Sequence, residues 1–248
     1  MTLTRSFKAA FAKTLTGCLA HLSVDCVVFG FHDRTLKVLL LKWRSTNVWA
    51  LPGGYVGHRE SLDDAAHRVL CERTGLNRAR LHQFSAFGGL DRRERASLRI
   101  FFGKMGLKPP PDAWPLQRVV SIGYYALVEH SKVTPRLDPF SDAFAWFPVR
   151  DLPTLAFDHA AIVRAGLQAV ADHVDSPSTV AELLPGPFTM PELQRVHEAV
   201  LGRPLDRRNF QKRILDRGGL ERLPERRTGA SHRPPFLYRF TDDGSSRT

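Results

Sequence analysis

The residue types best suited to chemistry are charged side chains on a segment that reads as one amphipathic helix, residues 61–74. Positions 69, 72 and 73 are spaced i, i+3 and i+4, so they share one face of that helix. Three carboxylates there would form an oxygen-rich site for Mg²⁺, which activates water and neutralises a pyrophosphate. The face instead carries Val69, Glu72 and Arg73, whose formal charges cancel. We therefore predict no metal site and no catalytic residue, with Arg73 placed to pair with Glu72 or with a bound phosphate.

The stretch Gly54–Leu76, GYVGHRESLDDAAHRVLCERTGL, resembles the Nudix box, the signature of hydrolases that cleave nucleoside diphosphates linked to another moiety. The positions in register with the box are Gly54, Glu60, Arg68, Leu70, Glu72, Gly75 and Leu76. Val69 and Arg73 stand where the enzymes carry glutamates. The resemblance therefore implies a scaffold that kept its frame but lost metal ligands, and we expect binding without catalysis. A simpler interpretation is that Val69 only widens the packing stripe of Leu62, Ala65, Ala66 and Leu70.

Composition and charge narrow the class of protein. The 248 residues, 43% of them apolar, are enough for one large domain or two smaller ones with a buried core. The formal charge of +11 favours anionic partners. Three scattered cysteines exclude a disulfide framework and a zinc site, which fits a reducing, cytoplasmic setting. The apolar runs are too short to span a bilayer, so we expect no membrane partner.

The first folded domain is expected at residues 19–176, after a flexible or helical lead-in at 1–18. A basic, proline-rich insertion at 88–117 is expected to be a surface loop or to lie near the ligand pocket. Helices are predicted at 61–74 and 160–174. Apolar, β-branched segments predict strands at 22–31, 36–42, 49–55, 80–87, 119–128 and 143–149. This order of elements gives an α/β fold with a mixed sheet packed between helices, which is also what the Nudix resemblance implies.

Residues 177–248 are expected to form a winged helix-turn-helix domain. A short helix at 179–184 precedes a helix that starts with a capping box of Thr189 and Glu192. The connection at 202–205 has the length expected of a helix-turn-helix, and Asp206 caps the next helix, which ends at 218–219. The residues expected to face the core from these two helices are Leu193, Val196, Val200, Leu201, Phe210, Ile214 and Leu215.

The second helix of this motif presents a basic outward face. Its expected DNA contacts are Arg207, Arg208, Gln211 and Lys212, side chains that read guanine and adenine edges or reach phosphates. Strands at 220–223 and 236–240 bracket a basic wing, with expected contacts at Arg226, Arg227, Thr228 and Arg233. From Arg203 to Arg239 there are 11 basic and 4 acidic residues, +7 of the total +11. This concentration of charge predicts binding to double-stranded DNA, against the simpler interpretation of a solvated, arginine-rich helical domain.

A Nudix domain followed by a winged helix resembles the bacterial Nudix-related transcriptional regulators, which include repressors of NAD biosynthesis and of sugar catabolism. The strings that carry this resemblance are WALPGGYV (49–56), RVVSIGYYALV (118–128), LAFDHAAI (155–162), LDRRNFQKRIL (205–215) and RTGASHRPPFLYRF (227–240). The resemblance implies a homodimer formed largely through the Nudix domains, with paired winged helices on a palindromic operator. We expect no cofactor, and a cleft that senses a small anionic effector such as ADP-ribose or a related NAD metabolite.

The effector cleft is expected to be lined by residues of the box and of its flanking segments. The predicted contacts are Arg44, Gly54, Glu60, Arg68, Glu72, Arg73, Arg92, Arg118 and His159. Two of them have a structural alternative, because Arg68 can bridge the box loop and helix, and His159 can be a buried, hydrogen-bonded histidine. Effector binding is expected to act through helix 160–174 on the placement of two winged helices and to release DNA.

Two other functions stay open from the sequence. One is an active Nudix hydrolase with an accessory nucleic-acid domain, in which Glu60, Glu72 and a carboxylate of the insertion rebuild a metal site. The other is a regulator of sugar catabolism that senses a pentose. Mg²⁺-dependent turnover of ADP-ribose would identify the hydrolase, and the response of a DNA complex to arabinose would identify the pentose sensor.

Overall fold

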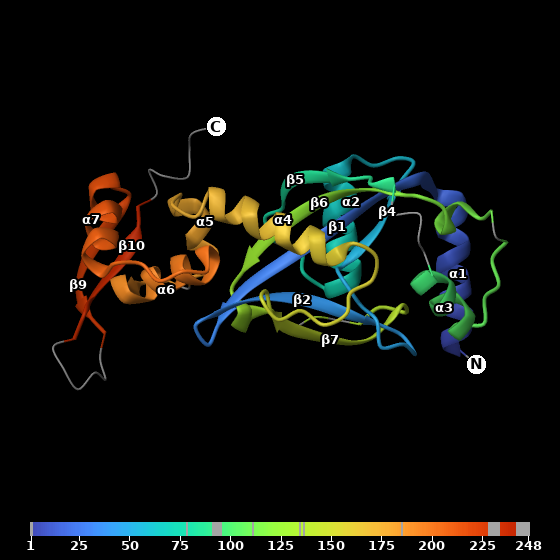
Figure 1. The fold of residues 1–248 in the computed structure, drawn as a ribbon, viewed down its shortest axis with the longest axis horizontal. Helices are drawn as coiled ribbons and strands as arrows, with labels where there is room; N and C mark the ends of the chain where they lie inside the picture. The colour runs from blue at the N-terminus through green and yellow to red at the C-terminus, as the bar shows by residue number, and fades with distance from the viewer. Residues whose placement is uncertain are drawn as a thin grey trace. The chain divides into compact units, whose positions relative to one another are not determined.

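Two compact units make up the chain in the computed structural model (Figure 1), which describes residues 2–77, 79–90, 96–110, 112–133, 135, 137–184, 186–227 and 234–241. The first unit is built from the residues up to 29, 37–126 and 133–166, and the second from 30–36, 127–132 and Leu167 onward. Helix α4 (His159–Asp172) therefore contributes its last residues to the second unit. The domain boundary expected after residue 176 stays a prediction.

A seven-stranded sheet forms the centre of the first unit. The main path of the sheet is β3-β2-β1-β6-β5, with β4 paired to β1 and β7 paired to β2. The strands are β1 (Cys18–His32), β2 (Thr35–Trp43), β3 (Trp49–Ala50), β4 (Gly53–Gly57), β5 (His82–Phe87), β6 (Val120–Val128) and β7 (Ser141–Pro148). Residues 23–30 of β1 are all buried, as expected for a central strand covered on both faces.

Helices cover the two faces of the sheet. Alternate residues of β1 point to opposite faces, so neighbouring residues of this strand contact different helices. Cys26 faces helix α2 (Leu62–Thr74), where its thiol donates to the carbonyl of Ala66 at 3.7 Å. Val27 points to the other face, where a Cβ added to Gly166 of α4 would lie 3.4 Å from its methyl group. The predicted α/β fold, with a sheet between helices, is confirmed (Figure 1).

Helix α2, which carries the box, begins and ends where its sequence signals predict. The Ser61 side chain accepts from the N–H of Asp64, and the Asp64 side chain accepts from the N–H of Ser61. Gly75 closes the helix in the left-handed region at φ 75°, a conformation that glycine adopts without strain. The residues of α2 that are buried are Ala65, Ala66, Val69, Leu70 and Thr74.

The described part of the 88–117 insertion contains regular elements joined by irregular segments. It contains helix α3 (Ala96–Lys104) and a 3₁₀ turn at Trp114–Leu116. Phe101 and Phe102 of α3 are buried in a cluster that Phe11 of helix α1 (Thr2–Gly17) also joins. The lead-in is thus helical, and it packs against the insertion.

The second unit has the element order of a winged helix. It contains α5 (Pro177–Ala181), β8 (Phe188–Thr189), α6 (Met190–Leu201), α7 (Arg207–Arg217), β9 (Leu220–Arg226) and β10 (Phe236–Phe240). The strands form a three-stranded sheet in the order β8-β10-β9. Among the described helices, none has both the length and the apolar character needed to cross a bilayer.

The predicted helix caps of this unit are confirmed, and so are the packing faces apart from Leu201, which is half-buried, and Leu215. Thr189 and Glu192 form the capping box of α6, and Asp206 accepts from the N–H of Asn209 at the start of α7. Phe210 and Ile214 are buried, but Leu215 is 43% exposed. The prediction that Leu215 faces the core is wrong, because it lies about 100° around the helix from Ile214 and so points to solvent.

Candidate functional site

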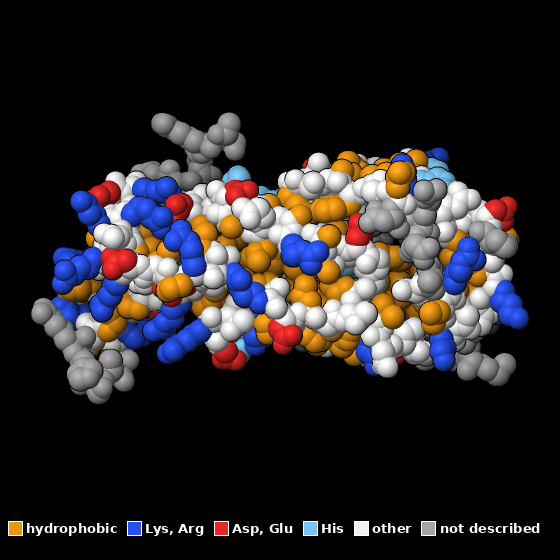
Figure 2. Space-filling view, viewed as in Figure 1, with side chains coloured by type: hydrophobic (Ala, Val, Ile, Leu, Met, Phe, Trp, Pro, Cys, Tyr) orange, Lys and Arg blue, Asp and Glu red, His pale blue; other side chains and the backbone are white. Residues whose placement is uncertain are grey.

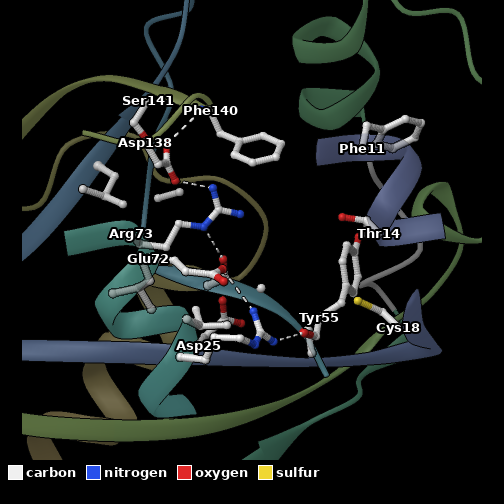
Figure 3. A pocket seen from close by; sticks show the side chains of 18 of the residues that line it. Phe11, Thr14, Cys18, Asp25, Tyr55, Glu72, Arg73, Asp138, Phe140 and Ser141 are labelled. Carbon is white, nitrogen blue, oxygen red and sulfur yellow. Dashed lines mark hydrogen bonds and ion pairs between the residues drawn. The ribbon is translucent and has the colours of Figure 1, made fainter. Parts of the chain in front are cut away.

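A cavity of about 890 Å³ opens beside the box helix in the first unit (Figure 3). Its wall comes from α1, β1, β4, α2 and α3, together with the segments at 138–141 and 157–159. The charged residues of the described wall are Lys13, Arg59, Arg68 and Arg73 against Asp25, Glu60, Glu72 and Asp138. Their formal charges balance, so an anionic ligand would have to compete with carboxylates for the arginines.

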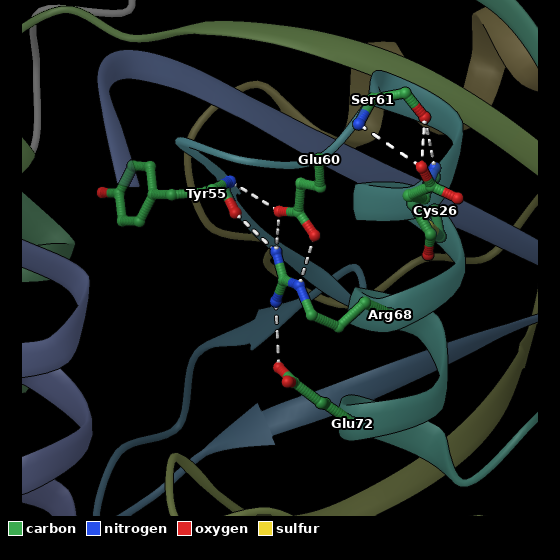
Figure 4. Close-up of polar contacts among 9 residues, drawn as sticks. Cys26, Tyr55, Glu60, Ser61, Arg68 and Glu72 are labelled. Atoms are coloured by element: carbon green, nitrogen blue, oxygen red, sulfur yellow. Dashed lines mark hydrogen bonds and ion pairs between the residues drawn. The ribbon is translucent and has the colours of Figure 1, made fainter. Parts of the chain in front are cut away.

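Arg68 ties the box loop to the box helix (Figure 4). Its Nε and Nη2 donate to Glu60 at 2.9 and 2.7 Å, and Nη2 also donates to the carbonyl of Tyr55 at 2.9 Å. Its Nη1 donates to Glu72 at 3.1 Å. Glu60 further accepts from the N–H of Gly57 at 2.5 Å. This network supports the structural alternative for Arg68, which bridges the box loop and the box helix. Arg68 is also among the residues that line the cavity.

The hydrogen bonds from Arg68, followed by that from the Gly57 N–H, hold the pKa of Glu60 below its ordinary value against the effect of burial. A carboxyl whose pKa is lowered by folding stabilises the fold above its unfolded pKa, and this contribution is lost as the pH falls through the folded pKa. We therefore expect Glu60→Gln to lower the free energy of unfolding at pH 7 by about 2 kcal/mol. The variant should also lose less stability than the wild type between about pH 5 and pH 3.

Urea unfolding at a series of pH values measures both effects. Glu72→Gln is the matched control, because the Glu72 side chain is 56% exposed and accepts from Arg68 through one nitrogen. It should change stability by less than about 1 kcal/mol. Equal pH dependence in Glu60→Gln and wild type would contradict the assignment.

Arg73 pairs across the cavity wall with a residue far away in the sequence. Its Nη1 donates to Asp138, and its Nε donates to the carbonyl of Gly53 at 3.0 Å. Its guanidinium also lies 4.3 Å from the ring centroid of Phe140. Arg73 and Asp138 point toward each other in Figure 3. The alternative that Arg73 pairs with Glu72 is wrong, because neighbours at i and i+1 diverge on a helix and Arg68 binds Glu72 instead.

Val69 is buried between the box helix and strand β4. It is 1% exposed, and a Cβ added to Gly54 would lie 2.8 Å from its Cγ2. Gly54 thus permits the close approach of β4 to α2. The simpler interpretation of Val69 as part of the packing stripe agrees with this burial, although Val69 also reaches the cavity wall.

His159 and Asp25 form a buried polar pair at the floor of the cavity. His159 Nδ1 accepts from the N–H of Leu51 at 3.0 Å, and its Nε2 lies 3.6 Å from Asp25 Oδ1. Asp25 also accepts from the hydroxyl of Ser121 at 2.5 Å. The structural alternative for His159, a buried and hydrogen-bonded histidine, is therefore the one that the geometry supports.

An aromatic wall faces these charged groups from the side of α1 and α3. Phe11 packs edge-on against Phe102 with centroids 4.7 Å apart, and Trp43 lies 5.1 Å from Phe101. Phe140 and Phe157 pack against the same cluster. The cavity thus joins an ionic end to an aromatic end, which suits a ligand that carries both an anionic group and a flat ring.

Two of the predicted effector contacts that the structure describes, Arg44 and Arg118, are not among the residues that line the cavity. Arg44 donates to the carbonyls of Asp138, Pro139 and Ser141, and so holds the turn that carries Asp138. Arg118 offers its backbone carbonyl to His21 Nδ1 at 3.0 Å. Arg92 lies outside the described residues. The predicted contacts that the cavity does bring together are Gly54, Glu60, Arg68, Glu72, Arg73 and His159.

Further residues that the sequence did not predict also line the cavity. They are Asp25, Tyr55, Phe11, Phe101, Asp138 and Phe140. Asp25 gave a usable signal, since an acidic residue within a buried strand needs partners. Asp138 gave none, because its pairing with Arg73 spans 65 positions.

The predicted DNA-reading helix is fixed by a network around its turn. Glu198 of α6 accepts from the N–H of Leu205 and from the Gln194 amide, both at 2.9 Å. The Gln194 amide also donates to the carbonyl of Leu205 at 2.8 Å. Gly202 ends α6 in the left-handed region at φ 68°. These bonds set the direction of α7 from α6.

Basic side chains gather on the surface of this unit (Figure 2). On α7, Arg207, Arg208 and Lys212 are exposed and Gln211 is half-buried. In the wing, Arg226 lies 3.8 Å from the Phe236 ring centroid, and Arg227 donates to both carboxylate oxygens of Glu192 at 2.7 and 2.8 Å. Thr228 and Arg233 lie outside the described residues. Both described arginines of the wing therefore already make contacts within the unit, Arg226 with Phe236 and Arg227 with Glu192.

Residues 19–166 match the NUDIX domain family, and residues 180–240 match the family described as NrtR DNA-binding winged helix domain. The first match spans more than half of the 248 residues, so the chain belongs to the Nudix family, with a winged helix domain of the NrtR type after the Nudix domain. The resemblance seen in the sequence is confirmed.

The similar proteins include both a regulator and an enzyme. The chain is 26% identical over 226 residues to the "ADPR responsive transcriptional repressor NtrR" of Acinetobacter baylyi, covering 88% of this chain and 81% of that protein. It is 27% identical to Shewanella oneidensis NrtR complexed with a 27mer DNA, with a TM-score of 0.67 over 90% of this chain and 95% of that one. It is also 27% identical over 140 residues to the ADP-ribose pyrophosphatase of Methanocaldococcus jannaschii, covering 55% of this chain and 69% of that enzyme.

Proposed function

We propose that this protein is a DNA-binding transcriptional repressor whose Nudix cavity senses ADP-ribose or a related NAD metabolite. The observation that carries the proposal is the presence, in one chain, of the cavity and of the winged helix unit with its basic α7. The similarity to the Acinetobacter repressor supports it, because that match extends over 88% of the chain and so includes both units. A cytoplasmic location goes with this function.

The ends of the cavity fit the proposed ligand class. An ADP-ribose-like molecule has a pyrophosphate for the arginine end and a nucleobase for the aromatic end. We give Arg73 Nη2 the role of meeting the anionic group, since its Nε and Nη1 already donate to Gly53 and Asp138. In this proposal Arg68, Glu60 and Glu72 shape the wall around the ligand.

We further propose that the cavity binds without hydrolysis. The Nudix resemblance implies a Mg²⁺ site on the box helix, and the side chains of this chain do not fit that ion. Val69 and Arg73 replace two ligands, and Glu60 and Glu72 both accept from Arg68. Among the described residues, no group of three His, Cys, Asp or Glu is arranged to hold a metal ion.

DNA binding is assigned to α7 and the wing. Arg207, Arg208, Gln211 and Lys212 would enter the major groove, with Arg226 and Arg227 near the phosphates. Each subunit of a two-fold dimer binds one half-site of a palindrome. We therefore propose a homodimer on a palindromic operator with half-sites one or two helical turns apart.

Titration of ligands into a protein–operator complex tests the function. Fluorescence anisotropy should show a loss of operator affinity with ADP-ribose of about 5- to 150-fold, the range typical of allosteric coupling. NAD and arabinose serve as the other arms of the experiment. Release by arabinose and not by ADP-ribose would replace the proposal by pentose sensing, and no binding to any operator fragment would overturn it.

The hydrolase stays the second candidate, and the similarity to the Methanocaldococcus pyrophosphatase is what favours it. We expect no Mg²⁺-dependent turnover of ADP-ribose above background, measured as release of AMP. Clear turnover in the wild type that Glu72→Gln abolishes would overturn the binding-only proposal.

A further inference from the structure

Asp175, a carboxylate of the second unit, contacts both helices of the helix-turn-helix. It follows α4 by three residues and lies within the second unit. Its Oδ2 lies 3.2 Å from Arg217 Nη2, and its Oδ1 lies 3.4 Å from Arg213 Nη2 on α7. Its backbone carbonyl accepts from Arg217 Nη1 at 3.2 Å. Arg217 thus binds both the carboxylate and the backbone carbonyl of Asp175, and these two contacts fix the orientation of the guanidinium.

Asp175 also reaches α6 through His197. The His197 Nε2 lies 3.7 Å from Asp175 Oδ1, and its Nδ1 bonds the carbonyl of Leu193 at 2.9 Å. Burial is the largest influence on His197 and lowers its pKa below the ordinary value, so the ring is neutral at pH 7. Among the described residues, Arg213 and Arg217 are therefore the cations that balance the charge of Asp175.

Arg213 and Arg217 occupy the side of α7 opposite the predicted reading face. At about 100° per residue, the midpoint of this pair lies about half a turn around the helix from the midpoint of the predicted reading face, and Arg217 lies about 80° from Arg207. The predicted reading face is made by Arg207, Arg208, Gln211 and Lys212. A displacement of Asp175 would therefore act on α7 through Arg213 and Arg217, which are not among the side chains predicted to read DNA. No other carboxylate in the described residues is paired with Arg213 or Arg217 among these ion pairs.

The contact has room to rearrange. Asp175, His197 and Arg217 line a hollow of about 520 Å³. Asp175 Oδ1 and His197 Nε2 are buried without a hydrogen-bond partner in the described structure. An incompletely satisfied contact beside open space can take a second arrangement more readily than a packed core can.

We propose that Asp175 is a positioning residue that couples helix α4 to the recognition helix α7, so that ligand binding in the cavity alters operator affinity through it. The inference rests on the proposed function and names its regulatory route. Helix α4 begins at His159 in the cavity wall and ends just before Asp175, so the two ends of the route belong to one short segment.

Operator affinity with and without ADP-ribose tests the route, using Asp175→Asn and the control Asp172→Asn. Asp172 lies in the last turn of α4, is exposed, and accepts from Gln168 at 2.8 Å. The measured quantity is the ratio of operator Kd values with and without saturating ADP-ribose. Asp175→Asn should lower this ratio toward one, by about tenfold, while Asp172→Asn keeps the wild-type ratio. Calorimetry should show unchanged ADP-ribose affinity in DNA-free Asp175→Asn.

A purely structural role would lower the melting temperature without changing the ratio. Asp175→Glu, which restores the charge, should recover most of the coupling. If Asp175→Asn fails to fold, Arg217→Gln tests the same contact, since its side chain is 51% exposed. A wild-type ratio in a folded Asp175→Asn or Arg217→Gln would overturn this inference alone, whereas no response of the wild type to ADP-ribose would overturn the proposed function with it.

Discussion

Replacing Arg73 with methionine is expected to lower the free energy of unfolding by about 3 kcal/mol at pH 7. Asp138 is 8% exposed as a whole residue, and Arg73 is its charged partner. Methionine keeps the packing of the stem and removes the charge, which leaves a buried carboxylate with the N–H of Phe140, at 2.8 Å, as a donor. Removing one member of a buried ion pair is costly, because the other charge stays desolvated. Urea unfolding of the variant and wild type measures the loss.

A double-mutant cycle separates the ion pair from lost packing. Arg73→Met/Asp138→Asn should be more stable than Arg73→Met alone, since the uncompensated carboxylate is gone. Arg164→Met is the matched control, because Arg164 is exposed on α4, and it should change stability by less than about 0.5 kcal/mol. A loss under about 1 kcal/mol in Arg73→Met would mean that the pair contributes no more than a surface ion pair.

Local signals made much of the fold predictable. Capping residues such as Ser61, Thr189 and Asp206 act on the next three residues, so a sequence reader can place helix starts from them. Gly75 and Gly202 mark helix ends for the same reason. The apolar, β-branched run at 22–31 predicted a strand without any knowledge of its neighbours, and the structure shows this segment within β1.

The partners inside the cavity were not predictable in the same way. Arg73 was expected to act on Glu72 or on a ligand, and the structure gives it Asp138, 65 positions away. Such a pairing depends on the turn held by Arg44, which only the folded sheet brings close. The aromatic wall has the same origin, because Phe11 and Phe102 meet only after α1 and α3 pack.

The Arg73–Asp138 pair also changes how the degenerate box is understood. A positive charge at position 73 could have stood in for a metal ion by touching a phosphate directly. In the structure that charge is already balanced by Asp138, so a ligand phosphate would bind the Arg73 guanidinium together with the Asp138 carboxylate.

Alanine at Arg207 or Arg208 is expected to weaken operator binding by about 1–3 kcal/mol, or about 5- to 150-fold, if the side chain reads a base. Both side chains are exposed on the first turn of α7, and the capping of that turn by Asp206 does not involve them. The folded unit should therefore survive the change. Each residue that contacts a phosphate instead should reduce the slope of log affinity against log salt by about 0.9.

Anisotropy titrations at several salt concentrations, with operator and scrambled DNA, distinguish these two roles. A base-reading arginine loses affinity for the operator alone, whereas a phosphate contact loses affinity for both DNAs and flattens the salt dependence. Arg80→Ala is the matched control, since Arg80 is an exposed arginine of the first unit. Unchanged operator affinity in both Arg207→Ala and Arg208→Ala would remove α7 as the reading helix and leave the wing as the element that binds DNA.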